Sequence, residues 1–90
     1  MKFEWDSDKA TANLNKHGVS FQEASTIFGD DLSLTDRDPA HSTNEHRFIT
    51  FGISSENRIL VVAYAERSDK IRIISARPAT RAERKFYEEG

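Results

Sequence analysis

The stretch RILVVAYAERSDKIRIISARPATRAERKFYEEG, residues 58–90, determines most of the predicted fold. Residues 58–67 contain a continuous apolar run, which is typical of a central strand. Ser68-Asp69 then indicates a two-residue hairpin turn, and residues 70–77 form the returning strand. This part of the chain therefore predicts two neighbouring antiparallel strands.

A helix is predicted directly after this hairpin. Pro78 prevents the strand from continuing, because proline has no N–H to donate to a neighbouring strand. Thr80 is a favourable N-cap, and Glu83, three residues later, completes a capping box. The sequence therefore predicts a short final helix that is rich in arginine.

The remaining elements are predicted from periodicity and capping residues. In the first helix, Ala10, Leu14 and the aliphatic part of His17 supply the apolar face. Consecutive strands with short connections favour an antiparallel sheet. We therefore predict one α+β domain over residues 1–90, an antiparallel β-sheet with two N-terminal helices and one C-terminal helix. Its other elements are a strand at residues 2–5, a helix from Asp6 to Gly18, a helix capped by Ser20 and Glu23, and strands at residues 32–35 and 47–53.

Composition excludes several classes of protein. The chain has no cysteine, so neither a disulfide framework nor a thiolate site is possible. The first residues lack the apolar segment of a signal peptide, and no apolar run approaches membrane length. We therefore expect a cytoplasmic protein that has no membrane partner.

Charge is divided unevenly along the chain. Residues 58–90 carry eight of the thirteen Lys and Arg residues and five of the fifteen Asp and Glu residues, a formal charge of +3. Residues 1–57 carry −5, so the total is −2. The net charge thus hides a cationic second half, which makes an anion-binding surface plausible.

The basic residues of the final helix lie on one stripe. Arg81, Arg84 and Lys85 are spaced at i, i+3 and i+4, and Arg77 precedes them at the end of the last strand. A guanidinium fork matches phosphate bidentately, so such a cluster is a candidate phosphodiester site. Solvated ion pairs with neighbouring glutamates explain the same spacing equally well.

Pairing across the hairpin turn predicts which side chains share a face. Arg67 pairs with Lys70, and Glu66 with Ile71. Continued without interruption, this register brings Glu66 and Tyr87 within reach of the cleft that Arg77, Arg81 and Arg84 form. The shared face is then Val62, Tyr64, Glu66, Ile71, Ile73, Ser75 and Arg77.

Three residues are candidates for proton transfer, and each has a structural alternative. Glu66 is a candidate base, although a carboxylate near arginines is often a structural partner with a lowered pKa. Tyr87 is a candidate acid, although a tyrosine near a chain end more often packs. His17 is a candidate acid or base, although its position before Gly18 also suits a helix C-terminus.

The histidines of the central loop do not indicate a metal site. His41 and His46 lie near Asp38 and Glu45, but their separation matches no standard ligand spacing. We therefore predict no metal and no cofactor.

Several motifs together are more specific than the charges. FEWD (residues 3–6), NLNKHGVSF (13–21), DPAHSTNEHRF (38–48) and ERSDKIRIISARPATRAERKFYE (66–88) closely resemble the BrnT family of bacterial toxins. The resemblance spans nearly the whole chain. It implies a RelE-like fold of the microbial ribonuclease type and a toxin that blocks translation by cutting RNA.

The resemblance also implies partners. A BrnA-type antitoxin with a ribbon-helix-helix DNA-binding domain would neutralise the toxin. The expected complex is a heterotetramer, two toxin–antitoxin pairs held together by the antitoxin. This complex would repress its own operon, so operator DNA is contacted only through the antitoxin.

The resemblance carries functional positions over residue by residue. The chain departs from the family at Ser68, where members often have glycine, and at Pro78, where a basic residue is common. The matching positions are Glu66 and Arg67 in the Glu-Arg pair, Arg72 and Arg77 in IRIISAR, Arg81 and Tyr87 in the helix that follows, and His17 in the KHG motif.

The chemistry that these residues support is attack of the RNA 2′-hydroxyl on the adjacent phosphate, which needs no metal. Two alternatives remain open: a non-catalytic module that binds RNA or a partner, and a co-repressor that acts only with the antitoxin. The expected roles are phosphate clamps (Arg67, Arg77, Arg81), a base (Glu66 or His17), an acid (Tyr87) and further RNA contacts (Arg72, Arg84, Lys85).

Overall fold

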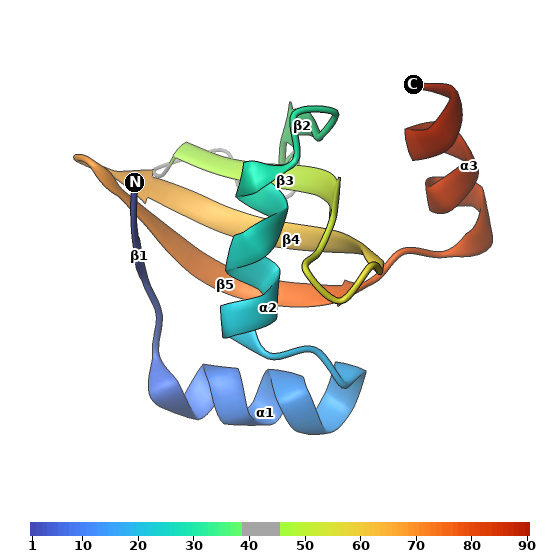
Figure 1. Ribbon diagram of the computed structural model, residues 1–90. Coiled ribbons are helices and arrows are strands. Elements are labelled where there is room, and N and C mark those ends of the chain that lie inside the picture. Colours follow the sequence, from blue (N-terminus) through green and yellow to red (C-terminus); the bar gives the residue numbers. More distant parts are fainter. Residues whose placement is uncertain (39–45) are drawn as a thin grey trace.

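The computed structural model describes residues 1–38 and 46–90 (Figure 1). No helix in these residues is long and apolar enough to cross a membrane. The elements, in chain order, are β1 (Lys2–Glu4), α1 (Ser7–His17), α2 (Phe21–Ser25), the short 3-10 helix η1 (Thr26–Gly29), β2 (Leu34–Arg37), β3 (His46–Ile53), β4 (Ile59–Arg67), β5 (Lys70–Pro78) and α3 (Arg81–Glu89).

The sheet is mixed, so the prediction of a purely antiparallel sheet is wrong. Its strand order is β1-β5-β4-β3-β2, and β1 pairs with β5 in parallel whereas the other neighbours are antiparallel. Phe3 on β1 packs against the core and lies beside Ile71 of β5. The local pattern of a three-residue strand carries no information about so distant a partner.

Helices α1 and α2 cover one face of the sheet, and α3 stands apart at one end (Figure 1). The core lies between the covered face and the helices. The prediction that Leu14 belongs to it is wrong, because this side chain is 49% exposed and Asn13 is buried instead. The central core residues are Val19, Phe21, Ala24, Ile27, Leu60, Val62, Tyr64, Ile71, Ile73 and Ala76.

Capping residues set the ends of the helices as predicted. Asp6 accepts hydrogen bonds from the amides of Asp8 and Lys9, which begins α1. Gly18 ends α1 at φ +69, a left-handed conformation that glycine adopts without strain. Ser20 accepts from the Glu23 amide and begins α2.

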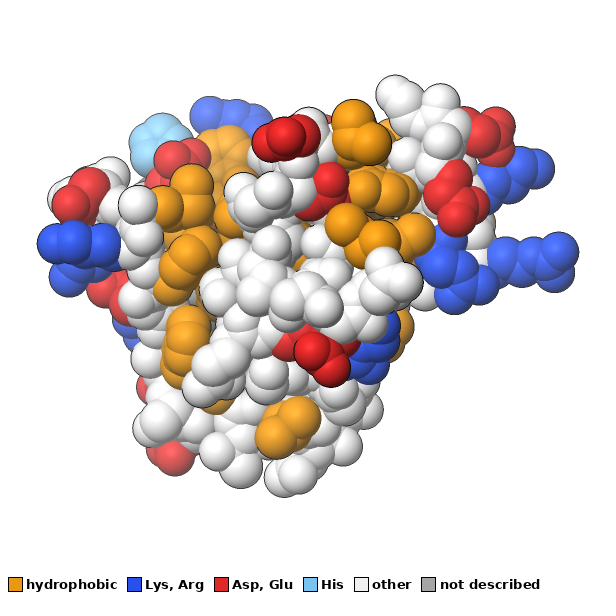
Figure 2. Space-filling model, in the orientation of Figure 1, with side chains coloured by type: hydrophobic (Ala, Val, Ile, Leu, Met, Phe, Trp, Pro, Cys, Tyr) orange, Lys and Arg blue, Asp and Glu red, His pale blue; other side chains and the backbone are white. Residues whose placement is uncertain are grey.

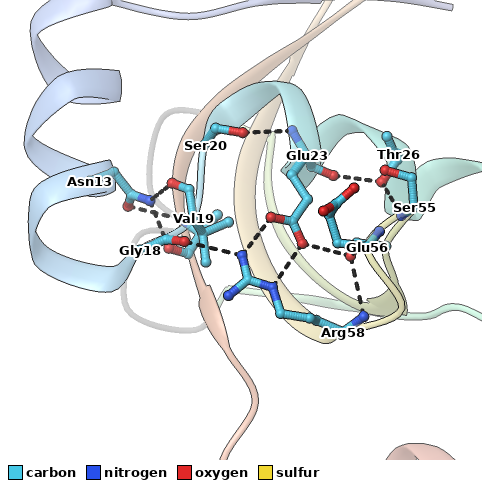
Figure 3. A network of polar contacts seen from close by, with 11 residues as sticks. Asn13, Gly18, Val19, Ser20, Glu23, Thr26, Ser55, Glu56 and Arg58 are labelled. Carbon is cyan, nitrogen blue, oxygen red and sulfur yellow. Dashed lines mark hydrogen bonds and ion pairs between the residues drawn. The ribbon is translucent and has the colours of Figure 1, made fainter.

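Glu23 does not complete the predicted capping box of α2. Its carboxylate accepts from Arg58 Nε at 3.0 Å and from Ser54 Oγ at 2.7 Å, and Arg58 Nη2 also reaches the Gly18 carbonyl at 3.1 Å (Figure 3). The hydrogen bond from Arg58 lowers the pKa of Glu23. This network joins the start of α2 to the β3–β4 connection.

Strand β2 begins two residues later than predicted because a turn precedes it. The Asp30 carboxylate accepts from the Leu32 amide at 2.9 Å, and the Asp30 carbonyl accepts from the Ser33 amide at 3.1 Å. Leu32 is therefore 75% exposed instead of lying in the strand.

The hairpin register is confirmed near the turn but changes further along. Arg67 pairs with Lys70 and Glu66 with Ile71, as predicted. A register shift between Ala63 and Tyr64 then inserts one extra residue into β5. Because side chains alternate along a strand, this shift moves Ser75 and Arg77 to the face opposite the predicted one.

Candidate nucleic-acid interface

The sheet face that α1 and α2 leave uncovered is called the open face below. Along each strand its members alternate with residues that face α1 and α2. Helix α3 lies at one end of this face, where the ring of Phe86 meets that of Phe51 at 5.7 Å. The open face consists of Lys2 and Glu4 (β1), Leu34 and Asp36 (β2), Arg47, Ile49 and Phe51 (β3), Val61, Ala63, Ala65 and Arg67 (β4), and Lys70, Arg72, Ser75 and Arg77 (β5).

Arg77 and Glu83 form a bidentate ion pair where β5 leads into α3. The two guanidinium–carboxylate distances are 2.7 and 2.9 Å, and Glu83 also accepts from the Thr80 amide at 2.8 Å. The hydrogen bond from Arg77 is the main reason that the pKa of Glu83 falls to about 2. The carboxylate of Glu83 thus completes the predicted capping box and also binds the guanidinium group of Arg77. A phosphate that binds this guanidinium group has to displace Glu83.

This ion pair makes stability depend on pH. The folded pKa of Glu83 is about 2 against an ordinary value of 4.5, so its contribution is complete above pH 4.5 and is lost as the pH falls toward 2. We expect Glu83→Gln to lower the unfolding free energy at pH 7 by about 1 kcal/mol, after allowance for solvent screening. Urea unfolding at pH 7 and pH 3 measures this. If parent and variant lost the same stability between the two pH values, the assignment would be wrong.

The basic side chains of α3 are exposed. Arg81, Arg84 and Lys85 all face solvent, and α3 has no buried residue. Figure 2, drawn from the helix-covered side, shows Lys and Arg side chains gathered around α3 at the right. Because Glu83 in the first turn of α3 holds Arg77, Arg77 and the basic residues of α3 lie at the same end of the sheet.

Tyr87 is turned away from the arginine cluster. Its hydroxyl donates to the carboxylate of Asp30, which raises the pKa of Tyr87 to about 12. The same Asp30 oxygen accepts from the Ile53 amide at 2.9 Å, so Tyr87 ties α3 to the end of β3. A hydroxyl held in this way is poorly suited to give a proton to a leaving oxygen, and the geometry favours a positioning role for Tyr87.

His17 lies at the same end of β5 as Arg77. It lines a shallow hollow of about 230 Å³ together with Asn13, Lys16, Ile74 and Ser75. Ser75 belongs to the open face and is two residues from Arg77, roughly 7 Å along the strand. His17 therefore stands at the border of the open face, beside Ser75.

Glu66 does not lie near the arginine cluster. It pairs with Ile71 on the helix-covered face, whereas Val61 is the residue opposite Arg77. Five residues along β4 separate the two positions, roughly 17 Å. The expectation that Glu66 and Arg77 share a cleft is therefore wrong, because the register shift places them on opposite faces.

Arg67 and Arg72 also lie at the hairpin end, far from α3. Both belong to the open face, and Arg72 donates to the carboxylate of Glu4 at 3.2 Å. The predicted arginines thus divide into two groups, one at each end of the open face.

The metal expectation receives no test here. His41 and Glu45 lie outside the described residues, and residues 1–38 and 46–90 contain no group of three or more His, Cys, Asp or Glu side chains that could hold a metal ion.

Asn13 is a structurally central residue that the sequence pattern does not reveal. Its amide nitrogen donates to the carbonyls of Val19 at 2.9 Å and Ala76 at 2.8 Å, and its oxygen accepts from the Ala76 amide at 3.1 Å (Figure 3). Strand β1 pairs with β5 only as far as Arg72. Beyond it, the Asn13 side chain replaces a neighbouring strand and fixes α1, with His17, against β5.

Comparison with known proteins agrees with this architecture. The family model for "Ribonuclease toxin, BrnT, of type II toxin-antitoxin system" matches residues 5–83. Among solved structures, the crystal structure of the Brucella abortus ribonuclease toxin BrnT is similar, with a TM-score of 0.70 and 24% sequence identity, and the match covers 90% of this chain and 99% of that chain. No curated protein sequence matches. At this identity the structural likeness shows the α+β fold.

Proposed function

Because the chain belongs to the BrnT family of ribonuclease toxins of type II toxin-antitoxin systems, we propose that it cuts RNA at the α3 end of the open face. The observation that carries this proposal is the gathering of Arg77, Arg81, Arg84 and Lys85 where β5 leads into α3. Four cations around one strand end attract the phosphate backbone of a nucleic acid. The family membership supports RNA as the substrate.

The proposed reaction is attack of a 2′-hydroxyl on the adjacent phosphorus, which forms a 2′,3′-cyclic phosphate and breaks the bond to the 5′-oxygen. The base takes the proton of the 2′-hydroxyl, and the departing 5′-oxygen takes a proton from solvent water to become a 5′-hydroxyl. Arg81 and Arg77 bind the non-bridging oxygens, and Arg77 exchanges Glu83 for the phosphate. These guanidinium groups stabilise the charge that grows on the oxygens in the transition state. Arg84 and Lys85 contact the neighbouring backbone.

We assign the base to His17. A histidine side chain can accept a proton at neutral pH, and His17 borders the open face beside Ser75. Glu66 lies on the other face, and Tyr87 is held by Asp30, so neither takes part in proton transfer in this scheme. In this scheme much of the cleavage rate comes from the positioning of the RNA and from the positive charge of the arginines.

Product ends test this chemistry. RNA cut by the purified protein is expected to carry 2′,3′-cyclic phosphate and 5′-hydroxyl ends, and a matched oligonucleotide with 2′-deoxyribose at the cut position is expected to stay intact. Mass spectrometry of the products distinguishes the ends. Products with 5′-phosphate ends, or cleavage of the deoxy substrate, would contradict the proposed mechanism.

The biological setting is part of the same proposal. The family implies a protein antitoxin; we propose that it is of BrnA type, forms a heterotetramer with the toxin and represses the operon through its own DNA-binding domain. Free toxin would act in the cytoplasm and inhibit translation by cutting RNA. The RelE-like classification also stays a prediction, supported by a sheet with helices on one face and a helix after its last strand.

A further inference from the structure

A second group of basic side chains lies on the open face at the hairpin end. We infer that this group, centred on Lys2 and Lys70, binds a backbone phosphate of the same RNA strand that is cut beside α3. This inference rests on the proposed function, because it takes RNA as the ligand. It assigns a role to Lys2 and Lys70, which neither family resemblance nor local spacing singles out.

The pairing of three strands places like charges directly beside one another. Lys2 of β1 is opposite Lys70 of β5, and Lys70 is opposite Arg67 of β4. Side chains that are opposite in neighbouring strands have Cβ atoms about 5 Å apart, and like charges in such positions destabilise a sheet. The pair Lys2 and Lys70 therefore has a cost to the fold, which an anion bound between the two ammonium groups would relieve.

The next row along the sheet adds further positive charge. It runs Glu4, Arg72, Ala65, Arg47 across β1, β5, β4 and β3. Glu4 accepts from Arg72 at 3.2 Å and lies 3.8 Å from the Lys70 ammonium. The two rows together contain five cations and one carboxylate. Figure 2 shows Lys and Arg side chains also at the left, where the hairpin and β1 lie.

The distance between the two ends suits a short piece of RNA. Val61 is opposite Arg77, and Arg67 is opposite Lys70, so six residues of β4 separate the two cationic groups. This is roughly 20 Å, which is about six nucleotides of a stacked strand at 3.4 Å each. Ala63 and Ser75, which lie between them on the open face, are small and leave room for the strand to pass.

The test compares RNA of two lengths. Labelled single-stranded RNAs of 12 and 3 nucleotides, with 2′-O-methyl groups throughout to prevent cleavage, are bound to the parent protein, to Lys70→Ala and to Lys2→Ala/Lys70→Ala. Fluorescence anisotropy gives Kd between 50 and 200 mM salt. The control is Arg37→Ala, which removes an exposed cation from the helix-covered side of β2.

For the 12-nucleotide strand, we expect the double variant to raise Kd roughly tenfold and to reduce the salt slope by about 1.4, since each phosphate contact on a single strand contributes about 0.7. The 3-nucleotide strand is too short to span the face, so its Kd should be the same for parent and variants. Arg37→Ala should leave the salt slope for the 12-nucleotide strand unchanged.

Equal losses for both lengths, or no loss for the longer strand, would overturn the inference. An unchanged RNA affinity together with weaker antitoxin binding would also overturn it, and would assign the group to the protein partner instead. Because the strands are not cleaved, this result is independent of whether the protein cuts RNA. A protein that binds in this way but does not cleave would refute the proposed function and leave the binding site intact.

Discussion

Replacing Asn13 by alanine is expected to lower the unfolding free energy by about 3 kcal/mol, which corresponds to roughly 15 °C in Tm for a domain of this size. The side chain is 7% exposed and makes three hydrogen bonds to backbone groups of Val19 and Ala76. Alanine leaves those buried groups without their partner, and each such loss costs about 1–3 kcal/mol.

The matched control for this variant is Asn15→Ala. Asn15 lies in the same helix, two residues away, and is exposed. A second variant, Asn13→Asp, keeps an oxygen for the Ala76 amide but removes both donors, so it should be as unstable as alanine at neutral pH. Urea unfolding of the three variants measures the differences. If Asn13→Ala were no less stable than Asn15→Ala, the claim that Asn13 holds α1 against the edge of β5 would be wrong.

The second large effect is expected at the arginine cluster. Arg81→Ala should reduce the rate of RNA cleavage by about 10²–10³, because removing one group that stabilises transition-state charge typically costs that much. The fold should not change, since Arg81 is exposed on a helix that buries none of its side chains. Single-turnover cleavage measures the rate, and thermal unfolding confirms that the variant is folded.

Arg77 is replaced by lysine instead of alanine, because Arg77 also holds α3 through its ion pair with Glu83. Arg77→Lys keeps the charge and removes the bidentate fork. We expect it to slow cleavage at saturating RNA more than it weakens binding, as a transition-state contact does. Arg37→Ala, which removes a cation from the opposite side of the sheet, is the control. Full activity in both Arg81→Ala and Arg77→Lys would place the site elsewhere.

Local features of the fold were predictable from the sequence. Asp6, Gly18, Ser20 and Thr80 act within three or four residues of the groups that they satisfy, so their roles follow from spacing alone. The hairpin register around Ser68-Asp69 follows in the same way, because a two-residue turn fixes which residues are opposite each other.

Features that depend on distant contacts were not predictable. Glu23 has the right spacing for a capping box, yet the guanidinium of Arg58, 35 residues away, binds its carboxylate instead. The hydroxyl of Tyr87 donates a hydrogen bond to Asp30, which lies 57 residues earlier in the chain. In the helix pattern of α1, the position of Asn13 is one expected to face solvent. Its side chain is buried because it hydrogen-bonds to the part of β5 that has no neighbouring strand.

The candidate site shows the same division. The cluster of Arg77, Arg81, Arg84 and Lys85 follows from helix periodicity and from the short link between β5 and α3. The assignment of Glu66 failed because a single extra residue in β5 reverses the face of every residue after it. The cationic row at the hairpin end was missed because β1 joins the sheet from the other end of the chain.

The most direct test of the central claim is cleavage of naked RNA by the purified protein in excess EDTA. The parent protein is compared with Arg77→Lys/Arg81→Ala, both checked for folding by thermal unfolding. We predict that the parent cuts the RNA and that the double variant is at least about 10²-fold slower. RNA that stays intact with the folded parent, or equal rates for the two proteins, would contradict the claim that the open face cuts RNA through its arginine cluster.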